Sequence, residues 1–231
     1  MKKLLILCLL SITNLTLADK GVYAVNDVCN GFGCFPGDTS GFPITITNSG
    51  SYQLTSNLVS TSTTVNAIEI NADDVTLDLN GFSIIGPRTC TGNNATLACT
   101  NSGMTASGVV ANGRKNIVVK NGITQGFDTG VELRSLGQRG NVVKNINSSQ
   151  NEFGITLING IISDSVANRN LHTGFNNGLL GALFIKDSYA SGNAQFSAVA
   201  ITCSNVFFIN NAADNCVRYT NESTCGSSAC P

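Results

Sequence analysis

The segment Asp187-Ser-Tyr-Ala-Ser-Gly-Asn193 decides the fold, because its pattern occurs several times in the chain. Each copy begins with Asn or Asp, has Ala or Ser three residues later, and usually has Asn six residues later. The other copies are Asn145-Ile-Asn-Ser-Ser-Gln-Asn151, Asp164-Ser-Val-Ala-Asn-Arg-Asn170 and Asn210-Asn-Ala-Ala-Asp-Asn-Cys216. Counted from Asn121, the first residues of successive copies are 24, 19, 23 and 23 residues apart. A fixed period of this length is typical of a solenoid built from stacked coils.

Short strand patterns repeat in phase with these anchors. They are Ala67-Ile-Glu-Ile70, Gly108-Val-Val-Ala111, Gly130-Val-Glu-Leu133 and Gly154-Ile-Thr-Leu157. Their alternation of apolar and other residues is typical of half-buried strands. We expect three strands per coil, the first set covering 68–70, 75–79 and 82–85. The side chains expected to point inward are Ile68, Ile70, Val75, Leu77, Leu79, Phe82 and Ile84.

Each strand is expected to pair in parallel with its equivalent one coil later. Asparagine at the recurring turn adopts left-handed backbone geometry and bonds to its equivalents above and below, which explains the 29 asparagines. The gap of 41 residues between Asn80 and Asn121 is close to two periods and holds an insert. A leucine-rich repeat has a similar period but needs more leucine, and a β-sandwich does not require asparagine in phase. The predicted fold class is all-β, a parallel β-helix of about six to seven coils.

The first 18 residues have the layout of a Sec-type export signal. Lys2 and Lys3 precede an apolar run, and Ala18 is the last residue of an expected cleavage site with small residues. The run is too short for a membrane anchor, and no later segment approaches spanning length. The expected division is 1–18 signal, 19–49 N-terminal cap, 50–216 β-helix and 217–231 Cys-rich C-terminal cover or tail. The expected location is therefore the periplasm, the cell surface or the outside.

Eight cysteines remain after the signal, and an even number in an exported chain favours disulfides. They fall into four close pairs, so we predict disulfide-tied caps and a tied insert. The predicted pairs are Cys29–Cys34, Cys90–Cys99, Cys203–Cys216 and Cys225–Cys230.

Composition excludes several classes of function. Hydrophobic residues make up 42% of the chain, which is too many for disorder driven by charge. The net charge is −1, whereas a nucleic-acid binder needs a basic face. We therefore expect no nucleic-acid partner.

The repeat resembles the right-handed parallel β-helix of the pectate-lyase-like superfamily, in particular exported bacterial repeat proteins of unknown activity. The segment Ala72-Asp-Asp-Val-Thr-Leu-Asp-Leu-Asn-Gly-Phe82 is similar to the entry region of such proteins. The resemblance covers about residues 27–216 and implies the right-handed fold. It implies little about activity, because that superfamily includes lyases, hydrolases, esterases, epimerases and adhesins. The motif sets of its polygalacturonase, pectate-lyase and epimerase types are not complete in this chain.

Candidate site residues come from the strand pattern. Glu69 and Glu132 are expected to face outward on one sheet, two coils apart, with Arg134 beside Glu132 to bind an acidic sugar. Two coils separate the backbones by about 9–10 Å. This distance is at the upper limit of the carboxylate separation in inverting glycosidases. Two exposed surface carboxylates are the competing interpretation.

Two further groups of residues have both a functional and a structural interpretation. Asp73, Asp74 and Asp78 suit a calcium ion, since clustered carboxylates are its preferred ligands, or they form a solvated turn. No other cofactor is expected. His172 suits a general base or a surface turn, and Phe153, Phe175, Phe196 and Phe208 are expected in the core.

The expected function is a non-enzymatic exported module for glycan binding, adhesion or envelope scaffolding, with a polysaccharide or an envelope surface as partner. The alternative is a polysaccharide lyase or glycoside hydrolase acting from the outward face of one sheet. The sequence does not give the ligand or the oligomeric state.

Overall fold

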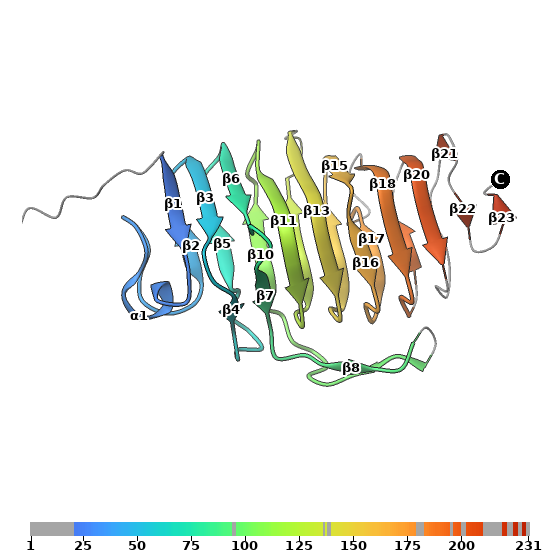
Figure 1. The fold of residues 1–231 in the computed structure, drawn as a ribbon, viewed down its shortest axis with the longest axis horizontal. Coiled ribbons are helices and arrows are strands. Elements are labelled where there is room, and N and C mark those ends of the chain that lie inside the picture. The colour runs from blue at the N-terminus through green and yellow to red at the C-terminus, as the bar shows by residue number, and fades with distance from the viewer. Residues whose placement is uncertain are drawn as a thin grey trace, which may run out of the picture.

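The computed structural model describes residues 21–93, 96–135, 137, 140–178, 183–194, 196–199, 202–209, 219–220, 224–225 and 228–229. The export segment and Cys216 and Cys230 lie outside these residues. The described chain is all-β apart from one four-residue helix, α1 (Cys29–Phe32). Its strands form two large sheets that extend along the molecule (Figure 1). No helix among the described residues is long and apolar enough to cross a membrane.

The larger sheet, called sheet A here, has 14 strands. Its main path is β1 (Val22–Val25), β3 (Gly50–Leu54), β6 (Val75–Asp78), β11 (Val118–Gln125), β13 (Asn141–Ser149), β15 (Gly160–Ser163), β18 (Leu183–Ser191), β20 (Thr202–Ile209), β22 (Thr224–Cys225) and β23 (Ser228–Ala229). The strands off this path are β4 (Leu58–Val59), β7 (Ser83–Ile85), β16 (Val166–Asn168) and β21 (Tyr219–Thr220). All its pairings are parallel except β22 with β23.

The second sheet, sheet B, has seven strands in an order that follows the chain. They are β2 (Ile44–Ile46), β5 (Ile68–Ile70), β10 (Ser107–Asn112), β12 (Thr129–Arg134), β14 (Phe153–Leu157), β17 (Thr173–Asn176) and β19 (Phe196–Val199). Each strand pairs in parallel with the next strand of sheet B. For example, Val109 pairs with Val131, and Val131 pairs with Ile155. This arrangement is compatible with a β-helix-like fold.

The core lies between the two sheets and follows the predicted alternation. Of the side chains expected to point inward, Phe82 is only partly buried and packs against the core, and the others are fully buried. The left-handed turns also fall where the pattern predicts them, because Asn121, Asn145, Asp164 and Asp187 have φ angles between 49° and 60°. In β11, β13 and β18 this residue lies inside one long strand, which bends there.

The asparagines six residues after each anchor of the repeat form a buried ladder of amides. Asn151, Asn170 and Asn193 are fully buried. The Asn151 backbone N–H donates to Asn170 Oδ1 at 3.1 Å, and the Asn170 N–H donates to Asn193 Oδ1 at 3.0 Å. Side-chain amides thus satisfy buried backbone donors that the turn would otherwise leave unpaired.

The strand register corrects two details of the repeat. Ser188 pairs with Val206, so the equivalent of Asp187 is Asn205, which also has a positive φ of 49°, and not Asn210. Moreover, β6 pairs directly with β11. The 41 residues from Asn80 to Asn121 therefore span one strand spacing of sheet A and not the expected two. The extra residues leave the stack as an arm.

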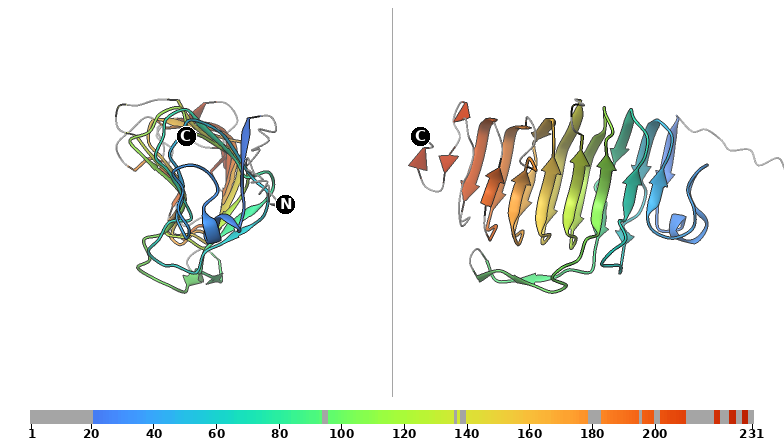
Figure 2. Two further views of the ribbon diagram at one scale, coloured as in Figure 1. Left: turned by 90° about the vertical axis from the view of Figure 1, so that its left-hand side faces the viewer. Right: turned by 180° about the vertical axis from the view of Figure 1, so that it is seen from behind.

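The arm, residues 86–106, runs alongside the stack in both side views (Figures 1 and 2). It holds β8 (Cys90–Thr91) and β9 (Ala98–Cys99), which pair antiparallel and are joined by the Cys90–Cys99 disulfide, as predicted. Arg169 Nη2 donates to the Cys90 carbonyl at 3.0 Å, and the Cys90 N–H donates to Gln150 at 3.1 Å. These bonds hold β8 of the arm against the later strands.

The segment predicted as the N-terminal cap contains β1 and β2, the end strands of the two sheets, and α1 between them. The Cys29–Cys34 disulfide is present, as predicted, and α1 lies across the end of the stack in the left view of Figure 2. The segment 217–231 was expected to lack strands but includes β21, β22 and β23. Cys203 is disulfide-bonded, and its predicted partner Cys216 lies outside the described residues, as does Cys230, the predicted partner of Cys225.

Candidate functional site

The two glutamates predicted as a carboxylate pair lie in one column of sheet B. Val110 of β10 pairs with Glu69 on one side and with Glu132 on the other, so two strand spacings, about 10 Å, separate their backbones. Glu69 accepts a hydrogen bond from Asn71 at 3.0 Å. Glu132 accepts one from Ser107 at 2.7 Å and forms an ion pair with Arg134. Separate partners therefore hold the two carboxylates, and the structure does not bring them together.

The predicted calcium ligands each have protein partners. Asp73 accepts the Lys115 N–H, Asp74 accepts the Asn116 side-chain amide, and Asp78 pairs with Lys120 at 3.3 Å. Across the described residues, no group of three or more His, Cys, Asp or Glu side chains is arranged to hold a metal ion. Calcium binding at these aspartates stays a prediction.

A different set of titratable side chains comes together where the chain enters sheet B. Asp128, Glu152 and His172 directly precede β12, β14 and β17, and these strands are neighbours in register. Consecutive backbone bonds connect them, because Phe153 N–H donates to the Asp128 carbonyl and His172 N–H to the Glu152 carbonyl, both at 2.8 Å. We call these three residues the acid–base row.

The arm supplies a cation to this row. Arg88 has a fully buried side chain whose Nη2 lies 3.0 Å from Glu152 Oε2, while its Nε donates to the Met104 sulfur at 3.4 Å. The Nη1 of Arg88 is buried and has no hydrogen-bond partner in the described structure. The ion pair thus connects the arm to the acid–base row.

The other two members of the row have shifted pKa values. Burial, followed by the neighbouring Glu152 carboxylate, raises the pKa of Asp128, while its bond from Thr129 and the charge of Arg88 act against the rise. Burial lowers the pKa of His172, which Glu152 partly offsets. The His172 ring packs on Phe153 with 4.8 Å between centroids, and Nδ1 lies 2.8 Å from Thr173 Oγ1. Neighbouring titratable groups whose surroundings shift their pKa values in opposite directions, as for Asp128 and His172, suit acid–base chemistry.

The sequence contained a signal for this row that the pattern analysis missed. Asp128-Thr-Gly, Glu152-Phe-Gly and His172-Thr-Gly place a titratable residue two positions before the glycine that recurs in β12, β14 and β17. The glycine marks the strand, and the residue two positions before it lies at the same edge of the sheet in each strand.

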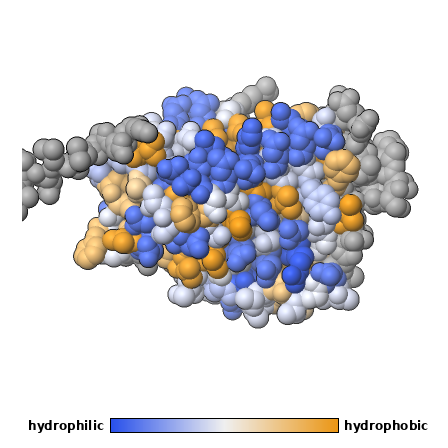
Figure 3. All heavy atoms as spheres, in the orientation of Figure 1, coloured by the Kyte–Doolittle hydropathy of each residue, from blue (hydrophilic) through white to orange (hydrophobic). Residues whose placement is uncertain are grey.

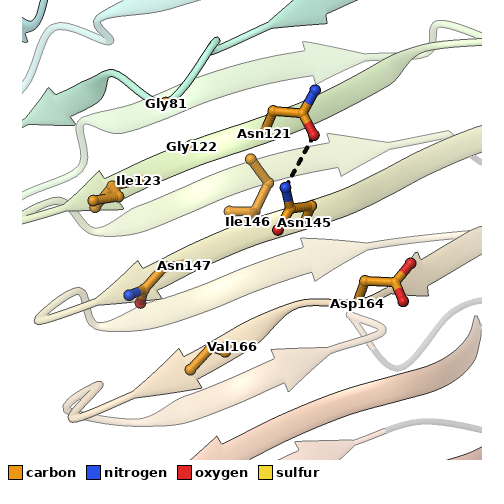
Figure 4. Close-up of a pocket in the computed structure, with 9 residues that line it drawn as sticks. All are labelled: Gly81, Asn121, Gly122, Ile123, Asn145, Ile146, Asn147, Asp164 and Val166. Carbon is orange, nitrogen blue, oxygen red and sulfur yellow. Dashed lines mark hydrogen bonds between the residues drawn. The ribbon is translucent and has the colours of Figure 1, made fainter.

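A second arrangement lies on the outer side of sheet A, along the bend of its long strands. The asparagine row consists of the left-handed residues Asn121, Asn145, Asp164, Asp187 and Asn205. Asn145 donates to Asn121 at 3.0 Å, as Figure 4 shows, and Asn205 donates to Asp187 at 2.8 Å. The residues come from successive strands, so they are spaced by about 4.8 Å.

A parallel column of side chains runs two residues further along the strands. In this floor column each residue pairs with the next. Its members are Ile123, Asn147, Val166, Tyr189 and Phe207. They are partly exposed, and Phe207 is 40% exposed. Figure 4 shows the asparagine row and the floor column on opposite sides of a hollow, from Asn121 and Ile123 to Asp164 and Val166.

Two hollows lie between the row and the column. One of ≈ 390 Å³ extends from Gly81 to Asp164 and Val166, and one of ≈ 280 Å³ extends from Asp164 and Val166 to Asn205 and Phe207. Because they share Asp164 and Val166, they form one shallow groove, here called the bend groove. Figure 3 shows hydrophilic residues gathered in a band along the long axis of this face.

Opposite charges balance along the groove. Lys144 Nζ lies 3.7 Å from Asp164, and Lys186 directly precedes Asp187. Lys120 is paired with Asp78 at the end of the row. The groove therefore offers many hydrogen-bonding groups without an excess of either charge.

Comparison of the chain with protein-family models, curated proteins and solved structures gave no match.

Proposed function

We propose that this chain is an exported, right-handed parallel β-helix of about six to seven coils that binds a carbohydrate polymer on its outward surface. The proposal includes membership of the pectate-lyase-like superfamily, for which the sequence resemblance is the support. Export is supported by the signal pattern, and the two disulfides suit an oxidising compartment. The module acts at the cell surface, in the periplasm or outside the cell.

The bend groove is the observation that carries the binding function. Amides and carboxylates are placed at regular intervals across five neighbouring strands, and two aromatic rings, Tyr189 and Phe207, lie at one end. A rigid, repetitive surface of this kind suits a repetitive ligand, because each unit of the ligand meets similar groups. Fixed side chains also reduce the entropy lost on binding.

The test is retention of the purified mature protein on immobilised polysaccharides, both neutral and acidic. We expect retention on at least one polymer and no release of reducing sugar from it. Protein heated until unfolded is the control. Absence of retention on every polymer would contradict the binding function.

A second candidate function, a carbohydrate-active enzyme, is favoured by the acid–base row. Asp128 and Glu152 directly precede the neighbouring strands β12 and β14, so their backbones are about 4.8 Å apart, which is close to the carboxyl separation of retaining glycosidases, about 5 Å. Asp128, with its raised pKa, is the proton donor in this candidate, and Glu152, which forms an ion pair with Arg88, is the nucleophile. This pair replaces Glu69 and Glu132, which Val110 separates.

The enzyme candidate is tested by release of reducing sugar or unsaturated uronate from the same polysaccharides. If it is correct, Asp128→Asn and Glu152→Gln each abolish release, whereas Glu69→Gln retains it. Equal activity in all three variants would exclude the acid–base row as the catalytic site.

A further inference from the structure

The bend groove differs from the usual docking site for a polypeptide. A peptide that binds by adding a strand needs an exposed sheet edge with unpaired backbone groups. The groove instead crosses β13, β15, β16 and β18, which have paired strands on both sides. Its ligand must therefore be recognised by side chains, and the chemistry of those side chains defines the ligand.

The asparagine row offers hydrogen-bond acceptors that the described residues do not use. Asn145 uses its amide N–H to bond Asn121, while its Oδ1 accepts no hydrogen bond from the described residues. In the same way Asp187 Oδ1 accepts from Asn205, and its second oxygen has no partner in the described structure. Asn145 and Asp187 are exposed. Such groups bond well to hydroxyls, which donate and accept at once.

The floor column adds a surface for stacking at one end of the groove. Tyr189 of β18 and Phe207 of β20 are direct neighbours in register, and both line the hollow that begins at Asp164. Aromatic faces pack against the C–H faces of sugar rings. The opposite end, around Gly81 and Gly122, has no aromatic lining residue.

We propose that the bend groove binds an uncharged, extended glycan parallel to the long axis of the molecule, with one sugar for each strand. The proposal rests on the proposed binding function and names its site and ligand class. The balanced Lys144–Asp164 pair gives no preference for a charged chain. The row spans four strand steps, about 19 Å, and the length of one pyranose unit in an extended chain is close to one step. The groove therefore holds about five sugars, and the aromatic end gives the bound chain a direction.

The test measures dissociation constants by titration calorimetry for cello-, manno- and chito-oligosaccharides of increasing length, with oligogalacturonates as the charged comparison. For one neutral series, we expect affinity to increase with length up to about five sugars and then to stay constant. Tyr189→Ala should weaken binding about tenfold. Phe32→Ala is the matched control, because Phe32 is 87% exposed on α1, away from the groove.

A second pair of variants tests the polar row without straining the backbone. Asn145→Gly removes the amide but keeps the left-handed conformation, since glycine adopts a positive φ without a steric cost. It should weaken binding about fivefold. Asn101→Gly, at a left-handed position of the arm, should leave binding unchanged. Melting curves of all variants show whether each is folded.

Three outcomes would overturn the inference. If a neutral glycan binds and the groove variants bind it as well as wild type, the site is wrong but the binding function stands. If only oligogalacturonates bind, the ligand class is wrong. If no glycan binds, in solution or in the retention assay, the binding function fails as well.

Discussion

Asn170 lies in the middle of the buried amide ladder and satisfies groups on both sides. Its Oδ1 accepts the backbone N–H of Asn151, and its Nδ2 donates to Asn193 Oδ1 at 3.0 Å and to the Ser148 carbonyl at 3.2 Å. A buried donor that loses its partner costs about 1–3 kcal/mol. The ladder therefore stabilises the turn at each step of the stack, independently of any ligand.

Asn170→Ala is expected to lower the free energy of unfolding by about 2–4 kcal/mol, because the Asn151 N–H and the Ser148 carbonyl both lose a partner. The measurement is equilibrium unfolding in urea. Asn168→Ala is the control, since within the described part of the chain the one side-chain bond of that partly exposed amide is long, 3.4 Å. A loss in Asn170→Ala no larger than in the control would show that water replaces the missing amide.

Asp128→Asn is expected to make stability less dependent on pH. The folded-state pKa of Asp128 is above its ordinary value of 3.8, mainly because of burial. The folded protein therefore loses stability as pH rises from 3.8 through the raised pKa, and the full cost is present at pH 7. Asparagine carries no such cost.

The melting temperature of Asp128→Asn should exceed that of wild type by about 2 °C at neutral pH. The difference should disappear near pH 3, where both side chains are uncharged. A variant that melts below wild type at pH 7 would mean that the charge of Arg88 contributes more than burial costs.

Single residues also show where sequence reasoning reaches its limit. Phe175 is fully buried, as expected, but Phe153 is partly exposed and packs on His172, while the side chains of Phe196 and Phe208 lie outside the described residues. Alternation assigns faces only within a regular strand. Phe153 lies next to Gly154 and Phe175 next to Gly174, so the local sequence does not distinguish the two phenylalanines. Likewise, Asn210 fits the repeat, with Ala213 three residues later, whereas Asn205 is followed there by Phe208, and only the register shows that Asn205 is the equivalent of Asp187.

At the scale of elements, the glycines of sheet B bring strands and turns unusually close. A Cβ on Gly130 of β12 would lie 2.7 Å from the Gly154 carbonyl oxygen and 2.7 Å from Thr124 Oγ1. Backbone and a fully buried side chain cannot move aside easily. The glycine is thus required by the packing of sheet B on sheet A.

Gly130→Ala should destabilise the protein by about 3 kcal/mol, the upper part of the range for overpacked cores. The measurement is again urea unfolding. Gly31→Ala in α1 is the control, because no atom lies within 4 Å of a Cβ there and its φ is not positive. Equal stability of the two variants would show that the strands separate without cost.

The arm is the element whose role was hardest to predict. Its cysteines and its place in the chain were visible, but the salt bridge between Arg88 and Glu152 joins residues 64 positions apart. Periodicity carries no information about such a contact, since the arm is outside the repeat. For that reason the sequence analysis placed the carboxylate pair within the repeat, at Glu69 and Glu132.

At the scale of the whole molecule, each strand depends on its two neighbours in the stack. β12 pairs with β10 and β14, whereas β2 of the same sheet pairs only with β5. The long-range order of the sheets could be predicted because the same local pattern recurs. The bend groove could not be predicted, because its shape depends on the angle by which the chain bends at each left-handed residue.

Native-state hydrogen exchange should therefore show a gradient along sheet B. The amides of β12 and β14 should exchange most slowly, because their opening requires separation from strands on both sides, and those of β2 should exchange faster. Amides that are equally protected in β2 and β12 would mean that the stack opens only as a whole. A gradient would instead show that nearest-neighbour contacts dominate its stability, as in other repeat proteins, and that an open end is where the stack begins to separate.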